Sequence, residues 1–430
     1  MTSVFRVFPD QQLSTVKYAE GPYIVLEDGR RYLDTSAGGT SYAVVGWNHP
    51  DVNHALKEQI AKFSHVDYKS WDDPNLERLA SLLLSRSENH LDKVYFSGSS
   101  GSEACEAAMK MSYQYHYDQG HPEKKWFISR EQSYHGSTSD ALVLGERPNL
   151  EFFRPMLSPY RARIAMHHPL YCRRSGETLE EYGLRSAQNL EEKILEIGPD
   201  SVAGFVGETI MGGLVGDVPP APNYWQAVRE VCTRYNVHLI LDEVYCGTGT
   251  SGRIYCCDWD KVSPDFLFIG KTLAAGYGVL SAVLTTSEIE QGILRSQKRL
   301  QHTTTHQGHS LSTAAALAVQ EIIHSTPLLA SVHDTGEAMR SAIKNELGEH
   351  EYFRDVRGRG LRFSFEYQCN RLSDFSAKLA DNLQKNHSLI VNCKWHRACF
   401  TPSLLLSPEQ AVFVVDAFCE EFRNLASSWK

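Results

Sequence analysis

The segment that decides the fold reads Leu239-Ile240-Leu241-Asp242-Glu243-Val244. It is an apolar strand that ends in two acidic residues. Further along the chain, the apolar run Asp265–Ile269 passes directly into Gly270-Lys271-Thr272. Because ligands of open α/β sheets gather at the carboxyl ends of the strands, we expect Asp242 and Lys271 to face one ligand.

Two further apolar runs, Lys93–Ser97 and Val202–Val206, are typical of buried strands, and helical patterns lie between the runs. Val52, Leu56 and Ile60, for example, fall on one helical face. Nearly continuous apolar strands that alternate with helices predict an α/β fold with a mainly parallel sheet covered by helices.

The chain changes character towards its C-terminus, where strands such as Leu361–Phe365 alternate and charged helices surround them. A length of 430 residues suits two or three packed domains. We expect residues 51–309 to form a large domain and residues 310–430 a smaller α/β domain. Residues 1–50 are expected to be an N-terminal segment that joins the small domain.

The composition excludes several classes of function. The net charge of −9 argues against a general electrostatic grip on nucleic acid or an anionic membrane. No apolar run reaches the roughly 18 residues of a membrane span, and the N-terminus has no apolar core of signal-peptide length. The ten cysteines are irregularly spaced and form no CxxC pair, so we expect reduced thiols in a cytoplasmic protein. Adjacent Cys256 and Cys257 have no second pair nearby, so no metal site is expected.

Asp242 and Lys271 together indicate one particular chemistry. Each alone has an ordinary explanation, as an acid at a solvated strand end or as a surface lysine. Together they match the needs of pyridoxal 5'-phosphate (PLP), because an ionised acid keeps a pyridine nitrogen protonated and a lysine amine forms an imine with an aldehyde. Gly276 and Gly278 fit a tight loop around a bulky cofactor.

A phosphate site is predicted at Phe96-Ser97-Gly98-Ser99-Ser100-Gly101-Ser102-Glu103-Ala104. A strand runs there into a Gly/Ser loop and then a helix, whose free N–H groups favour a dianion. Read alone, the stretch is equally typical of a flexible turn with a serine N-cap. Tyr134, in Tyr134-His135-Gly136, offers an aromatic ring that could stack on a flat heterocycle.

The order of these motifs resembles the class III aminotransferases, which are PLP enzymes of fold type I. The similarity extends from about Gly21 to Leu404 and includes Gly46-Trp47-Asn48-His49-Pro50 and Arg357-Gly358-Arg359-Gly360-Leu361. It implies a large domain with a mainly parallel sheet, a smaller α/β domain, and a homodimer whose sites are shared between subunits.

The resemblance also implies roles for individual residues. Lys271 would hold the cofactor as a Schiff base and move the proton, and Asp242 would pair with the pyridine nitrogen. The other implied cofactor contacts are Gly101 and Ser102 on the phosphate, Tyr134 and Val244 on the two ring faces, Glu208 at the start of an EPxxG-like motif, and Thr305 on the phosphate of the other subunit.

One competing motif is present. Gly247-Thr248-Gly249-Thr250-Ser251-Gly252 matches the GxGxxG fingerprint of dinucleotide-binding proteins. The glycines do not follow a first strand, and the residues after them do not form an amphipathic helix. The same stretch resembles the DEVxxGxGRTG motif of class III aminotransferases, with Thr248 and Thr250 where phenylalanine and arginine are common.

Two departures from the family pattern bear on the substrate. Members that use glutamate or 2-oxoglutarate often pair an acid, five residues after the EPxxG glutamate, with an arginine before a PPL-like motif. Gly213 and Cys399 occupy these positions here, so both halves of the ion pair are missing. The pattern is more similar to ω-amino acid or amine:pyruvate aminotransferases, in which Arg397 or Lys394 would supply a cation; Arg397 is otherwise a surface arginine.

These observations predict a ping-pong transfer of an amino group from an amine or ω-amino acid donor to a keto acid acceptor, with pyruvate preferred. Tyr42, Trp71 and Arg397 are predicted to line the substrate pocket from their position alone. Decarboxylation and racemisation share every cofactor residue and stay open, as does a non-catalytic PLP-fold protein. The identity of the donor is not readable from the sequence.

Overall fold

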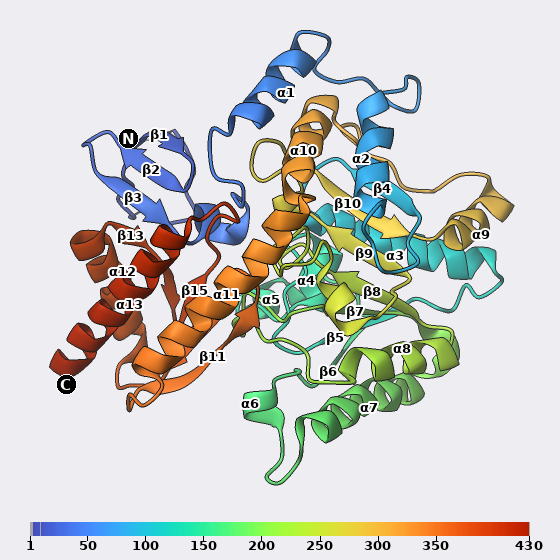
Figure 1. The fold of residues 1–430 in the computed structure, drawn as a ribbon. Coiled ribbons are helices and arrows are strands. Elements are labelled where there is room, and N and C mark those ends of the chain that lie inside the picture. The colour runs from blue at the N-terminus through green and yellow to red at the C-terminus, as the bar shows by residue number, and fades with distance from the viewer. Residues whose placement is uncertain (1–2, 9, 430) are drawn as a thin grey trace.

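The computed structural model describes residues 3–8 and 10–429, and the chain folds around three β-sheets (Figure 1). The largest sheet has seven strands in the order β4-β10-β9-β8-β7-β5-β6. Its strands are β4 (Lys93–Ser97), β5 (Trp126–Arg130), β6 (Arg161–Ile164), β7 (Val202–Glu208), β8 (His238–Asp242), β9 (Phe266–Ile269) and β10 (Ser281–Thr285).

This sheet is mainly parallel. Strand β10 runs antiparallel to both of its neighbours, β4 and β9, and every other neighbouring pair is parallel. Strand β4 therefore points in the same direction as β5 to β9, and these carboxyl ends lie at one edge of the sheet. The predicted α/β architecture, with a mainly parallel sheet covered by helices, is confirmed.

Both faces of the sheet are buried, which explains the continuous apolar strands. Leu239 and Leu241 of β8 belong to the larger apolar core, whereas Ile240 between them belongs to the core under α3 (Gly101–Asp118). Successive side chains of a strand point to opposite faces. A strand that is covered on both sides therefore has apolar residues at consecutive positions. The helices α7 (Leu179–Ile197) and α8 (Tyr224–Arg234) pack on each other, and α8 contacts β8.

The other two sheets join the ends of the chain. Strands β1 (Val16–Glu20), β2 (Tyr23–Leu26) and β3 (Arg31–Asp34) pair with β13 (Leu389–Ile390), which runs parallel to β3. Figure 1 shows these N-terminal strands beside the C-terminal elements. The remaining sheet has the order β11-β12-β15-β14 and contains β11 (Phe353–Arg359), β12 (Arg362–Tyr367), β14 (Asn392–Lys394) and β15 (Arg397–Phe400).

The division at residue 310 stays a prediction. Helix α10 (Ser310–Ile323), just past that point, packs on α1 (Pro50–Ile60) and α2 (Pro74–Leu84), whereas α11 (Thr326–Leu347) packs on α13 (Pro408–Ser428). The other helices are α4 (Ser139–Leu144), α5 (Leu150–Phe153), α6 (Pro169–Cys172), α9 (Ser287–Gln297) and α12 (Leu372–His387), with short helical turns η1 (Ala37–Ser41), η2 (Arg154–Met156), η3 (Pro199–Ser201), η4 (Cys256–Asp260) and η5 (Lys271–Leu273).

Within the described ranges, no single helix is long and apolar enough to cross a bilayer. Helices α10 and α11 meet that criterion only as a pair, by length and composition, and the pair is bent by 69°.

Candidate active site

The strand register brings the predicted acid and amine to one edge of the large sheet. Glu208, the last residue of β7, pairs with Asp242, the last residue of β8, and Asp242 pairs with Phe268 of β9. Lys271 follows the end of β9 directly, at the start of η5. The two strand ends that the sequence singled out are therefore neighbours in space.

These side chains open into a cavity of about 670 Å³. The lining comes from the ends of the large sheet, from the N-terminal segment and from the C-terminal strands. It includes Thr40, Ser41, Tyr42, Gly101, Ser102, Tyr134, His135, Arg147, Glu208, Gly213, Asp242, Val244, Tyr245, Lys271, Gly276, Asn392, Lys394, Arg397 and Cys399.

The carboxylate of Asp242 is buried and has two partners. His135 Nδ1 lies 2.8 Å from one carboxylate oxygen, and the Val244 N–H donates to the other at 3.0 Å. The His135 side chain is completely enclosed, and its Nε2 has no hydrogen-bond partner among the described residues. Sequence reasoning missed His135; its only signal was its place between Tyr134 and Gly136.

Glu208 is a second buried acid beside Asp242. Its Oε1 accepts a hydrogen bond from the Gly212 N–H at 3.2 Å, and Arg130 donates to its backbone carbonyl. Burial raises the pKa of the Glu208 carboxyl to about 7; the charge of His135 opposes this rise and the charge of Asp242 adds to it. Glu208 therefore takes up a proton near neutrality.

The amine of Lys271 is close to losing its charge at neutral pH. Burial and then the positive charge of Arg362 lower its pKa from 10.5 to about 8, against the opposing charges of Asp242 and Glu208. The Lys271 Nζ also lies 5.2 Å from the centroid of the Tyr245 ring. A buried amine whose pKa is low is a better nucleophile than an ordinary lysine.

The Gly/Ser loop and the start of α3 lie at the same edge of the sheet, where the predicted phosphate site would be. Ser100 occupies the N-cap position, but no side chain caps the first turn in the part of the chain that the structure describes. A Cβ at Gly101 would lie 2.6 Å from Cγ2 of Val244, so glycine is needed for Val244 to approach the helix start. The Glu103 carboxylate fixes the loop by accepting from the Gly98 N–H and from the Ser99 hydroxyl at 3.3 and 2.5 Å.

Tyr134 also lines the cavity, and the guanidinium carbon of Arg147 lies 4.3 Å from its ring centroid. Its hydroxyl lies 3.2 Å from that of Ser137, and the Ser137 N–H donates to the hydroxyl of Ser102 at 3.0 Å. Arg147 is exposed and lines the cavity. Sequence reasoning missed it because no motif marks it.

Of the predicted pocket residues, Tyr42 lines the cavity and Trp71 does not. The Tyr42 ring is held between Gly38 and Gly276, where a Cβ would lie 2.3 and 2.6 Å from it. The Trp71 side chain is 69% exposed. Thr305 is also exposed and lies outside the lining, so its contact with a neighbouring subunit stays a prediction.

Arg397 is buried, with 2% of its surface exposed, so it is not a surface arginine. Arg397 lines the cavity, and its guanidinium donates to the Leu214 carbonyl at 2.8 Å, while Nε has no partner among the described residues. Gly213 and Cys399 line the same cavity, so the two positions of the missing ion pair do face one space. Lys394 reaches the lining from an exposed position.

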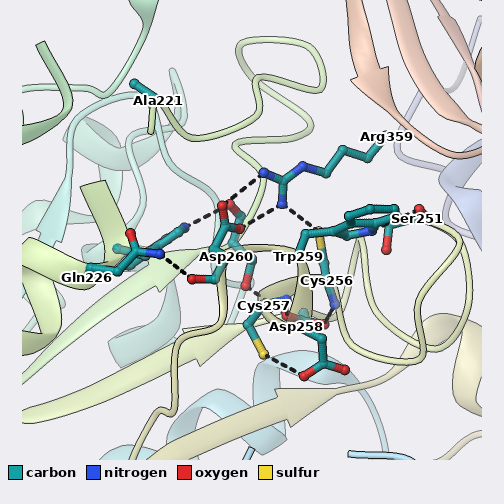
Figure 2. A network of polar contacts seen from close by, with 12 residues as sticks. Ala221, Gln226, Ser251, Cys256, Cys257, Asp258, Trp259, Asp260 and Arg359 are labelled. Atoms are coloured by element: carbon teal, nitrogen blue, oxygen red, sulfur yellow. Dashed lines mark hydrogen bonds and ion pairs between the residues drawn. The ribbon is translucent and has the colours of Figure 1, made fainter. Parts of the chain in front are cut away.

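The segment that follows β8 is held by hydrogen bonds to the residues around η4. The Glu243 carboxylate accepts from the N–H groups of Cys256 and Cys257, each at 2.7 Å. Figure 2 shows the neighbouring network, in which Arg359 of β11 contacts both carboxylate oxygens of Asp260 at 2.7 and 2.9 Å. The segment that carries Asp242 and Val244 is thereby linked to the C-terminal sheet.

Comparison with known proteins agrees with this geometry. The family model for class III aminotransferases matches residues 7–422. Gamma aminobutyrate transaminase 2 of Solanum lycopersicum is 34% identical over 82% of this chain and 77% of its own. An uncharacterized aminotransferase of Schizosaccharomyces pombe is 33% identical over 84% of this chain and 79% of its own. A crystal structure of an omega transaminase from Pseudomonas jessenii in complex with PMP has a TM-score of 0.91 and 26% identity, covering 99% of this chain and 97% of that one.

The chain belongs to the class III aminotransferases, and its cofactor is PLP. The residues present fit that cofactor. An uncapped helix N-terminus suits the phosphate, the Asp242 carboxylate suits a protonated ring nitrogen, and the Lys271 amine suits an aldehyde. All three open into one cavity whose walls include Tyr134 and Val244.

In cofactor-free protein, we expect the Lys271 amine to titrate near pH 8, because burial and Arg362 disfavour its charge. The amine is charged below that pH and becomes neutral above it. The ¹³C chemical shift of reductively methylated Lys271, followed from pH 6 to 11, measures the midpoint, and exposed Lys385 is the internal control. Arg362→Met should move the midpoint upwards. A midpoint equal to that of Lys385 would contradict the role of burial.

Proposed function

We propose that this enzyme moves an amino group from an amine or ω-amino acid to a small keto acid, with pyruvate preferred over 2-oxoglutarate. The observation that carries the proposal is the single cavity that holds Lys271 and Arg397 together with uncharged Gly213 and Cys399. A second carboxylate that leaves water needs its own cationic partner, and the family's usual pair is absent from both positions.

The similar proteins support this choice of substrates. One relative is called a gamma aminobutyrate transaminase, which names an ω-amino acid, and the similar solved structures are called omega transaminases. We infer a homodimer in the cytoplasm, with Thr305 serving the neighbouring site.

We assign the residue roles as follows. Lys271 carries the cofactor and moves the proton between carbons, while Asp242, steadied by His135, keeps the ring nitrogen protonated. When bound, PLP supplies an aldehyde for the amino group and a ring that stores the electrons freed as a proton leaves carbon. The other cofactor contacts are Gly101 and Ser102 on the phosphate, Tyr134 and Val244 on the ring faces, and Glu208 beside Asp242.

The substrate contacts follow the same cavity. Arg397 binds the carboxylate of the keto acid, since a guanidinium holds a carboxylate through two parallel hydrogen bonds. Tyr42 forms a wall near the reacting amine. Trp71 is exposed on the protomer surface, so it would contact substrate only in the site of a neighbouring subunit.

Lys271→Ala should abolish turnover while the protein still folds. A positioned acid–base group contributes about 10²- to 10⁴-fold, and this lysine also carries the cofactor. Turnover with a donor panel, together with the circular dichroism spectrum, measures both effects. Lys385→Ala, an exposed lysine on α12, is the matched control. Near-normal turnover of the Lys271 variant would refute the assignment.

Asp242→Asn should lower the turnover rate by several orders of magnitude, because a neutral amide cannot keep the ring nitrogen protonated. His135→Gln should have a smaller effect, since Asp242 keeps its hydrogen bond from the Val244 N–H. Steady-state rates of the two variants give the comparison. A loss below about tenfold for Asp242→Asn, or about 1.4 kcal/mol, would mean that another group faces the ring.

Arg397→Ala should reduce pyruvate efficiency about 10- to 100-fold, because one charge-assisted contact contributes roughly 1.5–3 kcal/mol. A donor without a carboxylate should be affected less. Wild-type kcat/KM should be higher for pyruvate than for 2-oxoglutarate. Lys394→Ala, which removes a cation at an exposed position of the same cavity, is the comparison variant. Equal effects of Arg397→Ala on all substrates would contradict a carboxylate contact.

A further inference from the structure

The ring of Tyr245 lines the cavity beside the two positions of the missing acid–arginine pair. Tyr245 lines the cavity together with Gly213 and Cys399. A Cβ at the adjacent Gly212 would lie 2.4 Å from the ring. Glycine at position 212, next to the position of the missing acid, therefore makes room for the Tyr245 ring.

A buried cation lies against the same ring. Arg362, on β12, is 0% exposed, and its guanidinium carbon lies 3.7 Å from the Tyr245 ring centroid. Its Nε donates to the Thr250 hydroxyl at 3.4 Å, whereas Nη1 and Nη2 are buried without a hydrogen-bond partner. No carboxylate in the described ranges lies within ion-pair distance of it.

An enclosed guanidinium without a counter-ion is unfavourable, and contact with an aromatic face offsets only part of that penalty. Arg362 also lies near Lys271, although it does not line the cavity. The Tyr245 ring contacts Lys271 as well as Arg362, since Lys271 Nζ is 5.2 Å from the ring centroid. The positive charge of Arg362 lowers the pKa of Lys271.

We propose that Tyr245 determines acceptor specificity by screening Arg362, a covered carboxylate-binding group, from the cavity. With the ring in place, the second carboxylate of a dicarboxylic keto acid meets the Tyr245 ring beside Gly213 and Cys399, and Arg362 stays covered. Without the ring, the two free nitrogens of Arg362 face the cavity and bind that carboxylate. The inference rests on the proposed function and names the residue that sets its acceptor preference.

The acceptor experiment uses three holoenzyme variants. Tyr245→Ala uncovers the guanidinium, and the ratio of kcat/KM for 2-oxoglutarate to that for pyruvate should rise about tenfold or more, the size of one charge-assisted contact. Tyr245→Phe keeps the ring, and its ratio should stay within about twofold of wild type. Tyr245→Ala combined with Arg362→Met should return the ratio to the wild-type value. Tyr245→Ser and Arg362→Gln replace any variant that fails to fold.

Ligand binding supplies a readout that does not depend on turnover. Isothermal titration calorimetry of each holoenzyme with glutarate, a dicarboxylate, is compared with butyrate, which has one carboxylate. Glutarate should bind Tyr245→Ala about tenfold more tightly than wild type or the double variant, and butyrate affinity should be similar in all three. Equal glutarate affinity in Tyr245→Ala and the double variant would overturn the screening role, as would a Tyr245→Phe ratio equal to that of Tyr245→Ala. Wild-type preference for 2-oxoglutarate would instead refute the proposed acceptor, while the glutarate comparison still decides whether Arg362 is covered.

Discussion

The buried carboxylate of Asp242 is the constraint on which the rest of the site depends. An isolated carboxylate is strongly disfavoured in a protein interior, and here three neighbours compensate for it. His135 lies at 2.8 Å, the Val244 N–H donates at 3.0 Å, and the Lys271 amine supplies an opposite charge nearby. Those groups follow β5, β8 and β9, so they meet only when the seven-stranded sheet has its observed strand order and register.

The same edge of the sheet gathers charges that perturb one another. Glu208 sits opposite Asp242 in the register, and its pKa of about 7 leaves it partly protonated beside the second acid. The charges of these acids and of Arg362 act in opposite directions on the pKa of Lys271, whose amine can change charge close to neutral pH. Titratable groups with shifted pKa values that lie in one cavity are typical of sites that transfer protons.

The cavity also depends on contacts from the C-terminal sheet. The loop that carries Gly213 is held from the C-terminal sheet, because Arg397 donates to the Leu214 carbonyl and Arg357 donates to the carbonyls of Val215 and Gly216. Figure 1 places that sheet beside the N-terminal strands. The cavity is therefore built from the carboxyl edge of the large sheet together with residues of the C-terminal sheet that are distant in the sequence.

The sequence by itself determined the strands with two buried faces and the residues directly after them. Continuous apolar runs mark β4, β7, β8 and β9, and the motifs after them include Asp242 and Lys271, because local patterning carries that information. It did not reveal β10, the antiparallel strand, or His135, whose importance comes from a contact with a residue far away in the chain. Only the tertiary structure decided that Arg397 is buried, that Trp71 is not in the cavity, and that Arg362 lies against Tyr245. The physical reason is that exposure and charge environment are set by packing between segments that are distant in the sequence.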